Sequence, residues 1–130
     1  MAISYKVLNS VLPSIIDAKF PILIRGRHGI GKSTIVYQIA EQRGLPVVER
    51  RASQMTEGDL LGLPKVEGNV TQWLAPEWLH NACNNPVILF LDEVDRATME
   101  VRQGIFELCD SRKIAGYTLH EDTVIFACVN

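Results

Sequence analysis

Apolar runs and amphipathic stretches alternate along this chain. Three runs, at residues 20–24, 86–91 and 123–129, are apolar almost throughout, which predicts strands buried on both faces. A shorter strand is expected over residues 46–50. Apolar residues at helical spacing predict helices in the intervals between the strands. These helices are expected over residues 5–16, 34–43, 76–83 and 98–109. The alternation indicates an α/β fold with a parallel sheet covered on both faces.

Two shorter stretches have the pattern of β-hairpins. Residues 65–67 and 70–73 alternate in polarity on either side of Gly68 and Asn69, a pair that favours a tight turn. Residues 113–120 contain Ala115 and Gly116 and predict a second hairpin. A short acidic helical turn is expected at residues 56–62, just before the first hairpin.

Length and composition restrict the class of protein. The 130 residues suit one domain, and a hydrophobic fraction of 47% is enough for a packed core. No apolar run approaches the ~20 residues that cross a bilayer, and the first residues lack a signal-peptide pattern, so a cytoplasmic location is expected. A net charge of −2 argues against nucleic acid as the main ligand. Local arginine pairs at 25/27 and 50/51 are interpreted as solvated loop ends. The three cysteines form no C-x-x-C pair, which argues against a zinc site.

Residues 26–33 fit G-x-x-x-x-G-K-[ST], the pattern of a phosphate-binding loop. Such a loop brings backbone N–H groups close to phosphate oxygens, and a Cβ at the glycine positions would block that approach. Lys32 is expected to reach the β- and γ-phosphates, and Ser33 to bind Mg²⁺ through its hydroxyl. An apolar strand before the loop and a helix after it are the context that the motif requires. The expected nucleotide-binding residues are Gly26, Arg27, His28, Gly29, Ile30, Gly31, Lys32, Ser33, Thr34 and Asp92.

Two carboxylates follow the apolar run at residues 86–91. The parallel sheet would place Asp92 and Glu93 beside the phosphate loop, because ligands bind at the carboxyl ends of such strands. Asp92 is expected to orient Mg²⁺, and Glu93 to accept a proton from the water that attacks the γ-phosphate. Asn130 follows the last apolar run, and its amide would emerge at the same edge of the sheet. It is expected to position the water or the γ-phosphate, although an ordinary strand-end asparagine explains the position equally well.

With these motifs in place, the chain resembles AAA+ ATPases, and more narrowly their MoxR-like and dynein-related branch. Residues 26–33 match Walker A, residues 89–97 resemble Walker B, and Asn130 falls where the family carries sensor 1. Residues 59–62, the hairpin after them and residues 73–76 resemble the helix-2 insert of that branch. Asp95 departs from the asparagine that is common in the MoxR pattern.

The resemblance implies a five-stranded sheet with a Mg²⁺-dependent ATP site at a subunit interface. It also implies assembly into a ring, usually a hexamer, and a chaperone-like remodelling of partner macromolecules. The hairpin at residues 65–73 would face the pore of the ring. The resemblance also points to proteins with a von Willebrand factor A domain as partners.

The family pattern continues beyond what is present here. A fifth strand, an arginine finger and a helical lid with sensor 2 are missing, so residues 1–130 are expected to be a partial large subdomain that ends at sensor 1. Arg96 and Arg112 do not occupy the place of an arginine finger. The 130-residue chain is therefore expected to bind ATP weakly and to hydrolyse it poorly.

Two other functions use the same phosphate loop. A P-loop kinase or other transferase would need neither Glu93 as a base for water nor Asn130 as a sensor. A nucleotide-binding scaffold would keep ATP bound without turnover. Release of phosphate without an acceptor would exclude the transferase, and loss of turnover in Glu93→Gln with ATP retained would exclude the scaffold.

Overall fold

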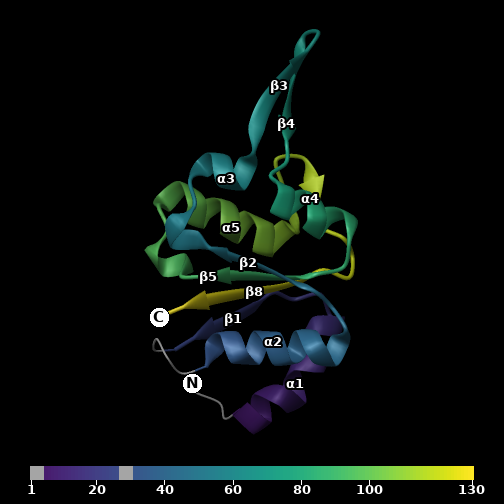
Figure 1. Cartoon of the computed structure of the whole chain (residues 1–130), viewed down its shortest axis with the longest axis vertical. Coiled ribbons are helices and arrows are strands. Elements are labelled where there is room, and N and C mark those ends of the chain that lie inside the picture. Colours follow the sequence, from purple (N-terminus) through teal and green to yellow (C-terminus); the bar gives the residue numbers. More distant parts are fainter. Residues whose placement is uncertain (1–4, 27–30) are drawn as a thin grey trace.

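A four-stranded parallel sheet is the centre of the computed structural model, which describes residues 5–26 and 31–130, with side chains from residue 10 onward. The strand order is β1-β8-β5-β2 (Figure 1). The strands are β1 (Ile22–Arg25), β2 (Val47–Arg51), β5 (Ile88–Asp92) and β8 (Val124–Val129). The register aligns the carboxyl ends, because Arg25 pairs with Val129 and Arg51 pairs with Asp92. The predicted α/β class with a parallel sheet is confirmed.

Helices cover both faces of the sheet (Figure 1). The helices are α1 (Tyr5–Asp17), α2 (Lys32–Arg43), α3 (Glu57–Leu61), α4 (Glu77–Asn84) and α5 (Met99–Ser111). On β5, Ile88 and Phe90 belong to the core under α1 and α2, whereas Leu89 and Leu91 belong to the core under α3, α4 and α5. The apolar residues at the first four positions of β5 therefore have a physical cause, since alternate side chains enter two different cores.

A β-hairpin projects far from the body of the molecule (Figure 1). It consists of β3 (Leu63–Glu67) and β4 (Val70–Leu74), and all ten side chains are exposed. A second, shorter hairpin pairs β6 (Lys113–Ile114) with β7 (Tyr117–Thr118). The hydroxyl of Tyr117 donates a hydrogen bond to the carbonyl oxygen of Trp73, which ties the second hairpin to the base of the first. Both predicted hairpins are confirmed.

Several sequence-based boundaries were wrong. The sequence predicts that Pro13 interrupts the first helix or starts a second turn, but Pro13 lies inside a continuous helix α1. Helix α2 begins at Lys32, two residues before the expected start. Arg50 and Arg51 belong to strand β2, so they are not solvated loop ends. Asp92 is the last residue of β5 instead of the first residue after it. The four strands of the main sheet among the described residues agree with the expectation that this chain lacks the fifth strand of the family.

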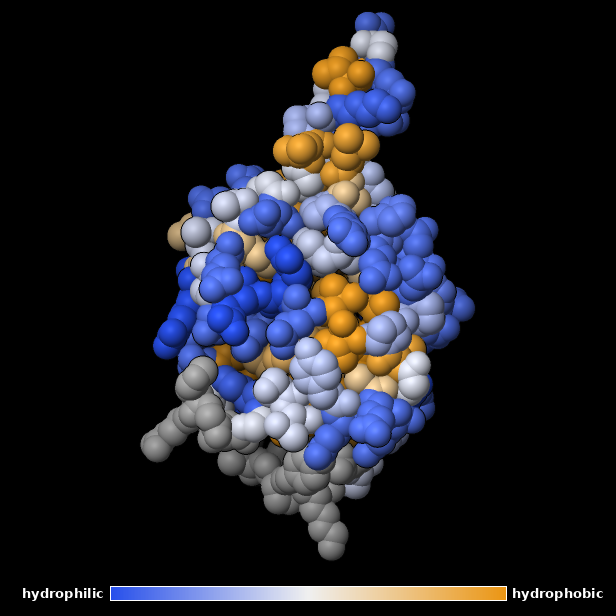
Figure 2. All heavy atoms as spheres, in the orientation of Figure 1, coloured by the Kyte–Doolittle hydropathy of each residue, from blue (hydrophilic) through white to orange (hydrophobic). Residues whose placement is uncertain are grey.

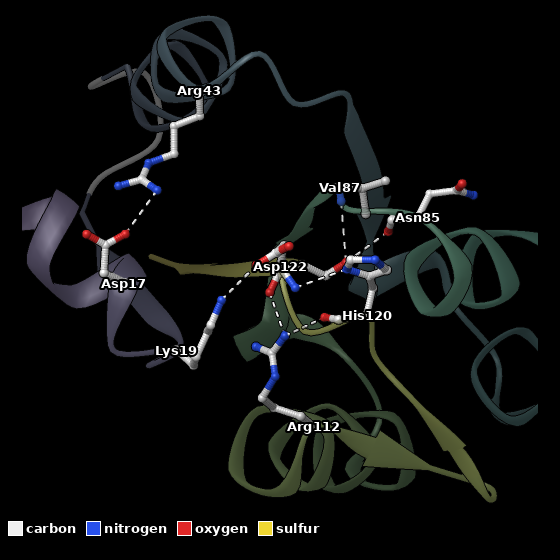
Figure 3. Close-up of polar contacts among 9 residues, drawn as sticks. Asp17, Lys19, Arg43, Asn85, Val87, Arg112, His120 and Asp122 are labelled. Carbon is white, nitrogen blue, oxygen red and sulfur yellow. Dashed lines mark hydrogen bonds and ion pairs between the residues drawn. The ribbon is translucent and has the colours of Figure 1, made fainter.

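The amino ends of the central strands are fixed by hydrogen bonds to backbone carbonyls (Figure 3). Arg112 ends α5 in the left-handed region, with φ 59°, and donates to His120 O at 2.8 Å and to Thr123 O at 2.7 Å. Burial lowers the pKa of Arg112 from its usual value. Arg112 is therefore a structural residue at the end of the sheet opposite the phosphate loop.

Two ion pairs tie α1 and the turn after it to the rest of the molecule at this end (Figure 3). Lys19 contacts Asp122 at 3.0 Å and Arg43 contacts Asp17 at 3.3 Å. These contacts are exposed, so they contribute little stability beside the burial of Leu12 and Ile16. In the described part of the chain, no helix has the length and apolar character that crossing a membrane requires.

Candidate nucleotide-binding site

The ammonium group of Lys32 lies at the carboxyl ends of β1 and β8. It donates to Asn130 Oδ1 at 2.7 Å, to Gly26 O at 3.0 Å and to Val129 O at 3.1 Å. Gly26 N–H donates in turn to Val129 O at 3.2 Å, which continues the β1–β8 pairing to the start of the loop. The structure thus brings together Lys32 and Asn130, two predicted site residues that are 98 positions apart in sequence.

The amino end of α2 has the features that an anion site requires. Its N-cap is Gly31, which has φ 83° and provides no side-chain cap, so the first backbone N–H groups of the helix have no side-chain acceptor from the cap. A helix start of this kind attracts phosphate oxygens through its N–H groups and its dipole. Ser33 and Thr34 are exposed in the first turn. Arg27, His28, Gly29 and Ile30 lie outside the described residues, so their expected roles stay predictions.

Asp92 and Glu93 sit at the end of β5, between β8 and β2. Asp92 Oδ1 accepts a hydrogen bond from Glu93 N–H at 2.8 Å, which fixes the Asp92 carboxylate at the strand end. Glu93 has φ 55°, an unusual value for a residue other than glycine. Strained backbone of this kind is concentrated at functional sites, where the surrounding structure holds it in place.

The Glu93 carboxylate is held on the β2 side of β5. The Ser53 hydroxyl donates a hydrogen bond to Glu93 Oε2, and Arg51 Nε lies 3.9 Å from the same oxygen. Ser53 belongs to the short 3-10 helix η1 (Ala52–Gln54) that follows β2, and η1 packs against the 3-10 helix η2 (Val94–Arg96). The side chain of Glu93 is only 19% exposed. Since Lys32 and Asn130 lie on the β1–β8 side, the structure does not bring Glu93 into contact with them.

Sequence reasoning missed both Ser53 and Arg51. The sequence predicts β2 as a strand, but the pairing of its last residue with Asp92 is a property of the folded sheet. Residues that end a neighbouring parallel strand lie at the same edge of the sheet as Glu93. The order of the strands decides which strand is the neighbour, and sequence pattern does not show that order.

The charges of the site act on a buried thiol beneath it. Burial, and then the negative charge of Asp92, raises the pKa of Cys128 to about 12, and the positive charge of Lys32 opposes this shift. Asp92 and Lys32 therefore both lie close enough to influence the same group. A cation and a carboxylate on either side of β8 are the arrangement that a triphosphate and its metal ion require.

The residues that the structure describes fit a magnesium nucleotide. A helix start without a side-chain cap, a lysine at the phosphate loop, a serine in the first helical turn and a carboxylate at the end of β5 match the phosphate, metal and metal-water ligands of P-loop proteins. Fold and site together define the class of P-loop nucleoside triphosphatases.

The comparison with protein families gives a narrower assignment. The family model of the AAA domain of the dynein-related subfamily matches residues 21–124. The chain belongs to this family of AAA+ ATPases, as the sequence motifs predicted.

Two relatives with established names are similar to the chain. It is 35% identical over 94 residues to Midasin from Giardia intestinalis, which covers 72% of this chain and 2% of that protein. It is 31% identical over 122 residues to Midasin from Dictyostelium discoideum, with 84% of this chain and 2% of that protein covered. The chain thus spans a very small part of these relatives.

Solved structures agree on the fold. A candidate ATPase from Cytophaga hutchinsonii superposes with a TM-score of 0.68 at 19% identity, over 96% of this chain and 38% of that one. A RuvB variant from Thermotoga maritima gives 0.64 at 15% identity, over 98% and 40%. At such identities the likeness shows the fold alone, and the chain spans about two fifths of each structure.

Proposed function

We propose that this chain binds ATP with Mg²⁺ and hydrolyses it as the core of an AAA+ ATPase. The observation that carries the proposal is the contact of Lys32 with Asn130 at the carboxyl ends of β1 and β8, beside the Asp92–Glu93 pair on β5. A strand-end amide next to the lysine of the phosphate loop favours a hydrolytic site over simple nucleotide binding, because it can position the γ-phosphate or water.

Each residue has a distinct role in the proposal. Lys32 would exchange its contacts with Gly26 O, Val129 O and Asn130 for phosphate oxygens. Ser33 and Asp92 would hold the metal ion, directly and through its water shell. Bound Mg²⁺ neutralises charge that develops on the phosphates. Glu93 would turn from Ser53 toward the β8 side and take a proton from the attacking water, whose oxygen bonds to the γ-phosphorus while ADP leaves.

The test is ATP binding and phosphate release by the wild-type chain and two variants. Lys32→Met should lose ATP affinity by at least tenfold, because a charged contact to phosphate disappears. Glu93→Gln should keep the affinity of the wild type and lose turnover, because an amide cannot accept the proton. Retained turnover in Glu93→Gln would overturn the hydrolytic proposal, and retained affinity in Lys32→Met would overturn the nucleotide site.

The larger assembly is also part of the proposal. We infer that residues 1–130 form most of the large subdomain of an AAA+ module that works in the cytoplasm, in a ring of about six copies, and remodels a partner macromolecule. Membership of the dynein-related family supports ring assembly and, through the similarity to Midasin, a partner with a von Willebrand factor A domain. Because an AAA+ site is completed by a neighbouring arginine, the 130-residue chain should turn over slowly by itself.

Two measurements test this part: the ATP turnover of the wild-type chain with and without a neighbouring AAA+ segment, and the assembly state of the chain. Size-exclusion chromatography with light scattering, with ATP and the Glu93→Gln variant, would detect a ring. A monomer under these conditions, or turnover by the wild-type chain alone as fast as that of complete P-loop ATPases, would contradict the inference.

A further inference from the structure

The outer edge of β2 is unpaired among the residues that the structure describes. In the sheet, β2 pairs with β5 on one side only. Ile88 N–H donates to Pro46 O across this pair at 2.8 Å. Since successive residues of a parallel strand direct their backbone groups to opposite sides, the N–H and C=O groups of Val47, Glu49 and Arg51 face outward. An added strand could hydrogen-bond to these groups.

Two hollows lie along this edge. The first, of about 440 Å³, is bounded by β2, by Asp59 of α3 and by Glu77 and Trp78 of α4. The second, of about 420 Å³, continues along β2 to Met55. Glu49 and Arg50 line both hollows, and the two together are called the trough below. Figure 2 shows an apolar patch beside hydrophilic residues where β2 crosses the view in Figure 1.

The Nε atom of Arg50 lacks an acceptor in this trough. It is buried, and no described residue accepts a hydrogen bond from it. The nearby Asp59 carboxylate is engaged elsewhere, because it accepts from Thr56 N–H at 2.9 Å and from the Thr56 hydroxyl at 3.1 Å. A buried donor of a charged group without an acceptor is unfavourable, so a ligand that supplies an acceptor is favoured.

The charges around Arg50 restrict the chemistry of that acceptor. Asp59 and Glu77 make the side-chain charge of the first hollow negative even with Arg50 included. A carboxylate would be repelled by these two groups, whereas a neutral carbonyl oxygen would not. The third acidic residue, Glu49, borders the hollow, but its side chain alternates to the α2 face of the sheet, where burial and then the negative charge of Glu49 raise the pKa of Tyr37. The first hollow therefore fits an uncharged acceptor together with a positive side chain, whereas the second is lined by the positive residues Arg50 and Arg51.

We propose that the outer edge of β2 binds an extended, basic segment of a partner protein by β-strand addition. The backbone of the segment pairs with Val47, Glu49 and Arg51. One of its carbonyl oxygens accepts from Arg50 Nε, and a lysine or arginine lies beside Glu77 and Asp59. Five strand residues at about 3.3 Å each give a pairing length of roughly 16 Å, so the segment needs five to seven residues.

The probe is the synthetic peptide acetyl-Ser-Val-Thr-Lys-Thr-Val-Ser-amide, added to the ¹⁵N-labelled 130-residue chain. A short β-addition without further contacts should give a dissociation constant of about 0.1–1 mM. The amide signals of Val47, Glu49 and Arg51 should shift most, because their N–H groups face outward. No shift up to about 2 mM peptide, or shifts confined to β1 or to the β3–β4 hairpin, would overturn the proposal.

A matched pair of variants isolates the backbone contact. Glu49→Pro removes one outward N–H from an edge strand that tolerates proline, and Glu49→Ala removes the same carboxylate but keeps the N–H. Glu49→Pro should weaken peptide binding at least about fivefold, and Glu49→Ala should leave it unchanged. Equal affinities would contradict strand addition. If Glu49→Pro unfolds, the wild-type chain and a peptide with N-methylated alternate residues give the same test, with loss of binding expected.

Two further changes test the charge contacts. Arg50→Met should weaken peptide binding by about five- to tenfold with little change in melting temperature, because Arg50 Nε has no acceptor to lose and the attraction of Arg50 to the partly exposed Asp59 is screened by solvent. A glutamate in place of the peptide lysine should bind several-fold more weakly, and Glu77→Gln should reduce that preference. Unchanged peptide affinity in Arg50→Met and for the glutamate peptide would refute the proposed contacts of Arg50 Nε and of the basic side chain. Concentration-dependent dimerisation through β2 without peptide would show that a second copy is the occupant, which also contradicts the proposal.

Discussion

Gly62 fixes the direction in which the β3–β4 hairpin leaves the body. Its backbone has φ 87° and ψ −157°, a region that residues with a Cβ essentially never occupy. A Cβ built there would lie 1.8 Å from Leu74 O, at the other strand of the hairpin base. Because Leu63 pairs with Leu74, relief of this clash must separate the two strands where the hairpin starts. We therefore expect Gly62→Ala to be strongly destabilising.

The magnitude has two parts. Backbone strain costs about 1–3 kcal/mol, and an overpacked contact costs a similar amount. A total of about 4 kcal/mol is a large share of the 5–15 kcal/mol that stabilises a typical domain. Gly68 is the matched control, since it also has a positive φ, 60°, but no atom lies within 4 Å of the position that an alanine methyl group would take. Gly68→Ala should cost only about 1 kcal/mol.

Urea denaturation of the three proteins measures the difference. With a slope of about 2 kcal/mol/M, Gly62→Ala should lower the midpoint by roughly 2 M and Gly68→Ala by roughly 0.5 M. Hydrogen exchange of the hairpin amides should accelerate in Gly62→Ala, because the base is disrupted first. Equal midpoints and unchanged exchange in both variants would refute the reasoning.

Three further predictions concern the site. Ser53→Ala should raise the kcat of ATP hydrolysis a few-fold with unchanged KM, because Glu93 loses a bond that holds it toward β2; a lower kcat in phosphate-release assays would contradict this. Asn130→Ala should lower kcat by about 10²-fold while ATP affinity changes little, and an equal loss of both would assign Asn130 to binding. Burial raises the folded-state pKa of Cys128 to about 12 from 9.0, so this thiol stabilises the fold at pH below 9 and loses that contribution as pH rises toward 12. The free energy of unfolding should therefore fall by about 1 kcal/mol between pH 8 and pH 10, and this decrease should be smaller in Cys128→Ala. An equal decrease in both proteins would contradict the assignment to this thiol.

The sequence was sufficient for elements whose signal is local. Continuous apolar runs predicted β5 and β8, and glycine in a turn predicted the β3–β4 hairpin, because burial on both faces and positive φ leave a direct mark on composition. Lys32, Asp92, Glu93 and Asn130 were expected at one edge because parallel strands end together. Ser53 and Arg51 were missed because their importance depends on β2 being the neighbour of β5, a long-range property that no local pattern encodes.

Strand β2 contributes no predicted catalytic residue, yet it determines where the Glu93 carboxylate lies. Side chains alternate along a strand, so Arg51 reaches Glu93 while Arg50 faces the trough on the other side of the sheet. Ser53 follows within two residues and contacts the same carboxylate oxygen as Arg51. Glu93 gains only one hydrogen bond and one long ion-pair contact there, and Arg51 is half exposed, so the sum is a few kcal/mol at most. Contacts of that size can be exchanged when phosphate and water offer Glu93 new partners, which is what a base that must move toward its substrate requires.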